Sequence, residues 1–93
     1  MKISISESAK KQFMEDNNKN YRIFIKGYGW GGPVFGLAQG EPQEEDETYT
    51  IDNINFSVEK DISDLIPGFH IEYYKGIFQR GYVVYVDGAS RSC

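Results

Sequence analysis

Short segments in which apolar and polar residues alternate place the strongest constraint on how this chain of 93 residues can fold. Ile54, Phe56 and Val58 alternate with Asn55 and Ser57, the pattern of a strand with one buried face. Similar segments occur at residues 3–5, 21–26, 34–39, 49–51, 69–74 and 81–86. Most connections between them are as short as those of hairpins, whereas parallel strands need long crossovers. The sequence therefore predicts a mixed or antiparallel β-sheet.

Two stretches predict short helices. Either Ser6 or Ser8 can begin a helix that continues through Asp16, because a serine oxygen accepts hydrogen bonds from the free amides of a first turn. A second helix is expected over residues 59–66, before the Pro-Gly pair that follows it. The predicted fold class is thus α+β, mostly β with two short helices, in the order β-α-β-β-β-β-α-β-β.

The length of the chain allows a single domain, which we expect over residues 1–88. Residues 89–93 are small and polar and predict a flexible C-terminal tail. An Asp-Asn pair at residues 52–53 predicts a hairpin turn between two of the strands.

Charge and composition exclude several classes of protein. The chain has 14 acidic and 10 basic residues and a formal net charge of -4, which argues against nucleic-acid binding. Five of the acidic residues fall within residues 41–47, where we expect a solvated loop rather than a metal site. No apolar stretch approaches the ~20 residues of a membrane span, and the N-terminus does not resemble a signal peptide. A single cysteine excludes an intramolecular disulfide, so the expected location is the cytoplasm.

A glycine-rich segment at residues 27–33 is the first candidate site. It contains four glycines, which allow positive φ angles and a tight loop, and it carries Trp30. No Gly-Lys-Ser/Thr sequence or helix follows it, so it is not a phosphate-binding loop. Taken alone, it predicts a hairpin with an exposed aromatic residue.

Cys93 and His70 are the other residues considered for chemistry. A thiol at the end of a chain should be exposed and therefore able to react or bind metal. His70 is the only histidine and lies within a predicted strand, where it should point outward or join a polar network. No second nitrogen or sulfur ligand lies near it, and no catalytic pair is evident, so an enzyme is not expected.

Three segments resemble the HesB-like family, which comprises the A-type iron–sulfur carriers. MKISISESAKKQF resembles the family's first strand and helix, and YRIFIKGYGWGGPVFGLAQGEP resembles its strand, glycine-flanked cysteine loop and return strand. IDNINFSVEKDISDLIPGFHIEYY resembles its later strand, short helix and strand. The resemblance covers nearly the whole chain in order and implies a HesB-like mixed or antiparallel β-sheet domain.

The same resemblance implies a function. Trp30, between Gly29 and Gly31, occupies the position of the family's loop cysteine, and Cys93 that of the first cysteine in its Cys-x-Cys tail. Cys93, together with the loop at Gly29, Trp30, Gly31 and Gly32, would then bind iron or an iron–sulfur cluster. The family's properties further imply a homodimer that works with iron–sulfur client or donor proteins.

Two alternatives follow from the tryptophan. An indole nitrogen only donates, and clusters typically take four thiolates, whereas this chain has one. Some HesB-like proteins resemble this chain in their Gly-x-Gly-Gly-Pro loop and have selenocysteine at x, so Trp30 could stand for selenocysteine in a thiol/selenol redox protein. In the other alternative the domain is a metal-free binding module that uses Tyr28 and Trp30 as its contact.

Overall fold

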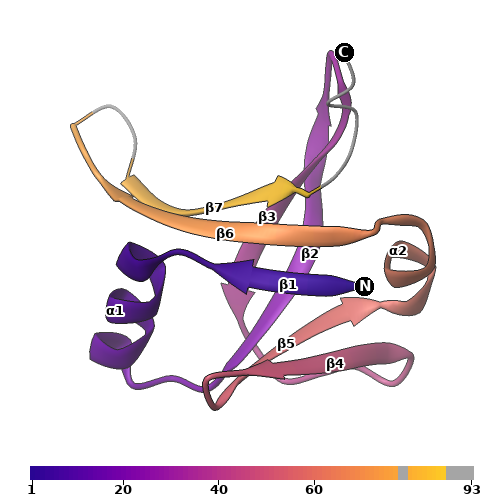
Figure 1. The fold of residues 1–93 in the computed structure, drawn as a ribbon. Coiled ribbons are helices and arrows are strands. Elements are labelled where there is room, and N and C mark those ends of the chain that lie inside the picture. The colour runs from indigo at the N-terminus through magenta and orange to yellow at the C-terminus, as the bar shows by residue number, and fades with distance from the viewer. Residues whose placement is uncertain (78–79, 88–93) are drawn as a thin grey trace.

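The fold is a mixed β-sheet with two short helices, as a computed structural model of residues 1–77 and 80–87 shows (Figure 1). Within these residues, seven strands form one sheet in the order β1-β6-β7-β3-β2-β5-β4. In chain order the elements are β1 (Lys2–Ile5), α1 (Glu7–Asp16), β2 (Asn20–Gly29), β3 (Gly32–Gln39), β4 (Asp46–Ile51), β5 (Ile54–Glu59), α2 (Lys60–Leu65), β6 (Gly68–Lys75) and β7 (Arg80–Val86). The predicted fold class and order of elements are confirmed.

Strand pairing explains why the sheet is mixed. The pairs β2–β3, β4–β5, β6–β7 and β3–β7 are antiparallel, whereas β1–β6 and β2–β5 are parallel. The first parallel pair joins the N-terminus to the second half of the chain, with Ile3 opposite Phe69. The sheet also curls, because its two edge strands, β1 and β4, come into contact (Figure 1).

Helix α1 begins and ends where its flanking residues satisfy the backbone. The Ser6 side chain accepts a hydrogen bond from the Ala9 amide at 3.1 Å, so Ser6 rather than Ser8 is the cap. Asn17 ends the helix in the left-handed conformation, with φ of 56°, and donates its backbone N–H to the Phe13 carbonyl. Helix α2 is one residue shorter at each end than expected, because Glu59 still belongs to β5.

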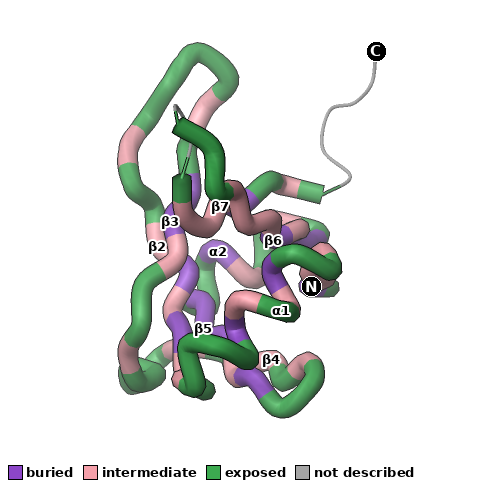
Figure 2. The backbone as a smooth tube through the Cα atoms, turned by 90° about the vertical axis from the view of Figure 1, so that its left-hand side faces the viewer, coloured by how far each residue is buried: buried purple, intermediate pink, exposed green. Residues whose placement is uncertain are grey.

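The core lies on the sheet face that α1 covers. Phe13 of α1 is 1% exposed and stacks on Tyr82 of β7, with ring centroids 4.5 Å apart. It also meets Tyr21 of β2 edge-to-face at 4.8 Å and Phe56 of β5 at 5.5 Å. The buried residues therefore line the inside of the curled sheet, while most of the outer surface is exposed (Figure 2).

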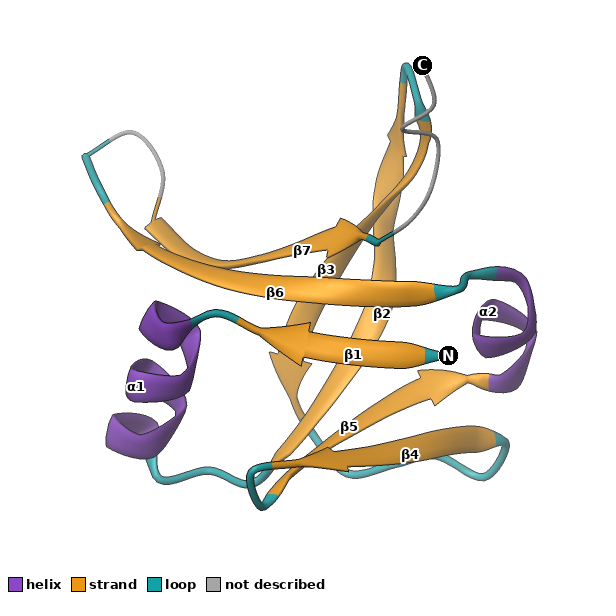
Figure 3. Cartoon of the chain, in the orientation of Figure 1, coloured by secondary structure: helices purple, strands orange, loops and turns teal. Residues whose placement is uncertain are grey.

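Turns rather than helices make most of the connections, as the cartoon in Figure 3 shows. Asp52 and Asn53 both have positive φ angles, 52° and 68°, between β4 and β5. Two left-handed residues match the twist of a two-residue hairpin, so the predicted turn is confirmed. Among the described residues, no helix is both long and apolar enough to cross a membrane.

Candidate functional site

The glycine-rich segment forms the end of the β2–β3 hairpin. Both strands extend further than the sequence predicted, and Gly29 of β2 lies opposite Gly32 of β3. Trp30 and Gly31 alone connect them. Gly32 has φ of +111°, which a residue with a side chain rarely adopts. The expected loop at residues 27–33 is thus mostly two paired strands with a very short turn.

A β-bulge marks where the end of the hairpin leaves the rest of the sheet. Ile25 lies opposite Phe35, and the next pair is Gly27 with Val34, so Lys26 is the additional residue. A bulge of this kind bends a strand and increases its twist. In Figure 1 the end of the hairpin extends past β6 and β7, away from the core.

The side chains at the end of the hairpin are in solvent. Trp30 is fully exposed, at 106% of its reference area, and Tyr28 is 77% exposed. A Cβ added at Gly31 would meet no atom within 4 Å, and one at Gly29 would make only an ordinary contact with Val34 at 3.6 Å. Among the described residues there is therefore room for a side chain at both Gly29 and Gly31. The space beside position 30 is open to another molecule or chain segment.

Cys93, the predicted thiol ligand, lies outside the described residues, as does the expected tail at 89–93. Gly29, Trp30, Gly31 and Gly32 do lie together at the turn, as the sequence predicted.

His70 takes part in a polar network on the outer face of β6. Its Nδ1 lies 2.8 Å from Ser4 Oγ on β1, and its Nε2 lies 3.0 Å from Glu72 Oε2. Ser4 is directly opposite His70 in the parallel pair, and Glu72 is two residues further along the same strand. The expectation that His70 joins a network is confirmed, although its partners depend on a strand pairing that the sequence does not reveal.

The acidic segment at residues 41–47 contains one residue that is not solvated. Asp46 begins β4, and its side chain is 1% exposed. It accepts two hydrogen bonds from Arg22 on β2, at 2.7 and 2.8 Å, and one from the Gln43 amide at 2.8 Å. The hydrogen bonds from Arg22 hold the pKa of Asp46 below its ordinary value. For Asp46, the prediction of a solvated loop is therefore wrong.

The described residues do not fit an iron–sulfur cluster by themselves. Residues 1–77 and 80–87 contain no group of three or more His, Cys, Asp or Glu side chains that could hold a metal ion. At the hairpin turn, Trp30 presents an indole, whose N–H donates and has no lone pair for a metal. Any metal held near this turn would need ligands from Cys93 or from another molecule.

Comparison with known proteins gives a match in structure alone. No protein-family model matches the sequence, and no curated protein matches it. The fold is similar to that of IscA, whose crystal structure contains a [2Fe-2S] cluster, with a TM-score of 0.76 and 15% identity. That match covers 98% of this chain and 90% of IscA.

Two further solved structures have a similar fold. Escherichia coli SufA, which is involved in the biosynthesis of iron–sulfur clusters, matches with a TM-score of 0.74 and 16% identity, over 98% of this chain and 85% of SufA. A protein from Aquifex aeolicus, solved by NMR, matches with a TM-score of 0.61 and 19% identity, over 89% of both chains. The HesB-like fold expected from the sequence is thus confirmed, and this chain shares the fold of IscA and SufA.

Proposed function

We propose that this protein takes part in iron–sulfur cluster biogenesis as a carrier-like protein. The observation that supports the proposal most is the likeness to IscA and SufA over 98% of the chain. The glycine-flanked turn at the end of the β2–β3 hairpin adds support, because position 30 is fully exposed there. An exposed turn of this kind is accessible to a second protein that delivers or receives a cluster.

The ligands in this proposal come from more than one chain. Cys93 is the only cysteine, so a homodimer supplies two thiolates of the four that a cluster typically takes. Client or donor proteins, or small thiols, would supply the others. Gly29, Gly31 and Gly32 would let the backbone approach the bound group closely, while Trp30 would not act as a ligand.

Anaerobic reconstitution with iron and sulfide tests the proposal on four proteins: the parent chain, Cys93→Ser, Trp30→Cys and Tyr28→Cys. Visible absorption and iron content are measured in each. The Tyr28→Cys variant is a matched control, because it puts an exposed thiol on the same hairpin two residues away. We expect weak uptake that Cys93→Ser abolishes, and clearly stronger uptake in Trp30→Cys than in Tyr28→Cys. Equal uptake in the two hairpin variants, or none in any protein, contradicts the proposal.

A second candidate function, a metal-free binding module, is favoured by the exposure of Tyr28 and Trp30. Exposed aromatic residues at the end of an extended hairpin are typical contact residues in protein interfaces. This candidate predicts that no variant binds iron. It also predicts that Trp30→Ala weakens binding to a partner protein while leaving the fold intact.

A native selenocysteine at position 30 is a third proposal, and it would make the protein a redox protein that pairs this position with Cys93. Selenocysteine is encoded by UGA, which differs by one base from the tryptophan codon UGG. The open space around Trp30 is compatible with such a reactive side chain. Reading the native gene tests the idea: a UGG codon at position 30 rules it out.

A further inference from the structure

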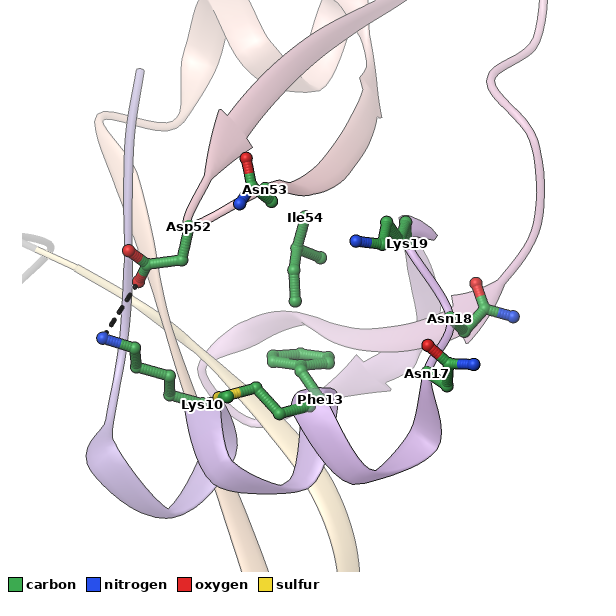
Figure 4. A pocket seen from close by; sticks show the side chains of 9 residues that line it. Lys10, Phe13, Asn17, Asn18, Lys19, Asp52, Asn53 and Ile54 are labelled. Carbon is green, nitrogen blue, oxygen red and sulfur yellow. Dashed lines mark ion pairs between the residues drawn. The ribbon is translucent and has the colours of Figure 1, made fainter.

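A pocket on the other side of the molecule from the extended hairpin belongs to none of the features above. It lies between the second half of α1, the residues that follow this helix, and the β4–β5 turn (Figure 4). Its volume is about 430 Å³, within the range of ~300–1,000 Å³ typical of sites for small molecules. The residues that matter for its chemistry are Lys10, Phe13, Met14, Lys19, Asp52 and Ile54.

The floor of the pocket is rigid, and Met14 supplies its accessible apolar surface. Phe13 and Ile54 belong to the core and are only 1% and 6% exposed, so they hold the shape of the floor, whereas Met14 is 71% exposed and can contact a ligand. Two tight turns hold the rim: the left-handed cap at Asn17 and the left-handed pair Asp52–Asn53. A pocket that is already shaped loses little conformational entropy when a ligand binds.

The rim is positively charged, in contrast to the chain as a whole. Lys10 lies 3.7 Å from Asp52, and both side chains are nearly half exposed. Lys19 forms no ion pair among the described residues, and in Figure 4 its ammonium group points toward Ile54. Two lysines and one aspartate give the lining a charge of +1, whereas the chain has a net charge of -4.

We propose that this pocket binds a small organic carboxylate, with the carboxylate beside Lys19 and the apolar part of the ligand against Met14. Lys19 favours a negatively charged ligand, because its ammonium group has no carboxylate partner among the residues described. The exposed Met14 side chain favours an anion with an apolar body over an inorganic anion, because an inorganic anion would leave Met14 in water. The ligand is therefore an anion with an aromatic or aliphatic body.

The test uses the full chain labelled with ¹⁵N and two probes of nearly equal shape, 3-phenylpropionate and its neutral amide. Titrations are followed by the backbone amide signals of residues 10–19 and 52–54. We expect saturable shifts confined to these residues, with the carboxylate bound roughly fivefold more tightly than the amide, the upper range for an exposed ion pair. In Lys19→Gln, the affinity for the carboxylate should fall to that for the amide.

Lys26→Gln is the matched control, because it removes the same charge from β2, outside the pocket. It should leave both affinities unchanged. Three outcomes would overturn the proposal: shifts that do not saturate, shifts centred elsewhere, or equal affinities for the two probes that Lys19→Gln does not alter. The iron measurements described above do not involve this pocket, so the two proposals can fail separately.

Discussion

The Tyr21 hydroxyl is the one buried side-chain polar group in the described residues without a hydrogen-bond partner. A buried hydroxyl of this kind loses its bonds to water and gains none in return. We therefore expect Tyr21→Phe to leave the free energy of unfolding unchanged or to raise it by up to about 1 kcal/mol. Urea denaturation measures this free energy.

Tyr82→Phe is the control for that measurement. The Tyr82 hydroxyl donates to Asp16 Oδ2 at 2.8 Å, and burial together with this carboxylate raises the pKa of Tyr82 well above its ordinary value. Removing this hydroxyl should lower the free energy of unfolding by about 1 kcal/mol. If Tyr21→Phe destabilises the protein more than Tyr82→Phe does, the Tyr21 hydroxyl has a partner after all.

The Arg22–Asp46 pair should make the stability of the protein depend on pH. Arg22 lowers the pKa of Asp46 in the folded state, so the pair contributes fully above the unfolded pKa of about 3.9. Its contribution is lost as the pH falls through the lower folded pKa. We expect Arg22→Gln to reduce the free energy of unfolding by about 2 kcal/mol at pH 7, because Asp46 loses two charged hydrogen bonds.

Urea denaturation at pH 7, 5 and 3 checks this prediction, and the difference between the parent and Arg22→Gln should narrow at the lowest pH. Lys60→Gln is the control, since the ion pair of Lys60 with Asp64 is exposed and should contribute little. A difference that stays constant with pH would mean that Arg22 acts through packing instead of charge.

At the scale of single elements, the β2–β3 hairpin depends on Gly32. Its φ of +111° is strained for any residue with a Cβ, although the surrounding space is open. Gly32→Ala should therefore lower the free energy of unfolding by about 1–3 kcal/mol or rearrange the turn. Gly31→Ala, which has neither a positive φ nor a close neighbour, should have almost no effect. Circular dichroism during thermal unfolding compares the two variants. Equal losses of stability would contradict the view that the positive φ of Gly32 requires glycine.

Most elements could be predicted because their signals are local. Alternation of apolar residues predicted the strands, a capping serine at position 6 or 8 predicted the start of α1, and residues 52–53 predicted their turn. The end of the hairpin was predicted as a loop because glycine has low strand propensity. Its backbone is nevertheless paired, since Gly27 and Gly29 lie opposite Val34 and Gly32.

What could not be predicted depends on contacts between distant residues. The parallel pair β1–β6 brings Ser4 beside His70, and the pairing of β2 with β5 beside β4 brings Arg22 to Asp46. No local pattern reveals either contact. The candidate site was partly predictable for the same reason: the glycines and Trp30 are close in sequence, while the pocket beside Lys19 joins α1 to a turn more than thirty residues away.

At the scale of the whole molecule, Gly68 of β6 lies where the N-terminal strand β1 pairs with the second half of the chain. A Cβ at this position would lie 2.5 Å from the Lys2 carbonyl oxygen, on the neighbouring strand β1. Backbone atoms cannot move away as a flexible side chain can, so Gly68→Ala should force β1 and β6 apart. We expect a loss of about 1–3 kcal/mol in the free energy of unfolding, as overpacking typically costs.

Gly27→Ala provides the control, because an added Cβ there meets no atom within 4 Å. Guanidinium denaturation of both variants checks the prediction. Equal stability of Gly68→Ala and the parent would show that β1 can shift without cost.

The extended hairpin has a further consequence for how the protein moves. Strand β2 pairs with β5 only from Asn20 to Ile23, and the recorded pairing of β3 with β7 is Phe35 with Val84. Beyond these pairs, no neighbouring strand within residues 1–77 and 80–87 is paired with the outward-facing amides of the hairpin. Their hydrogens should exchange with deuterium much faster than those near Tyr21, within the same strand. We therefore expect one continuous strand to combine a protected base with an end that opens more readily, without unfolding of the core.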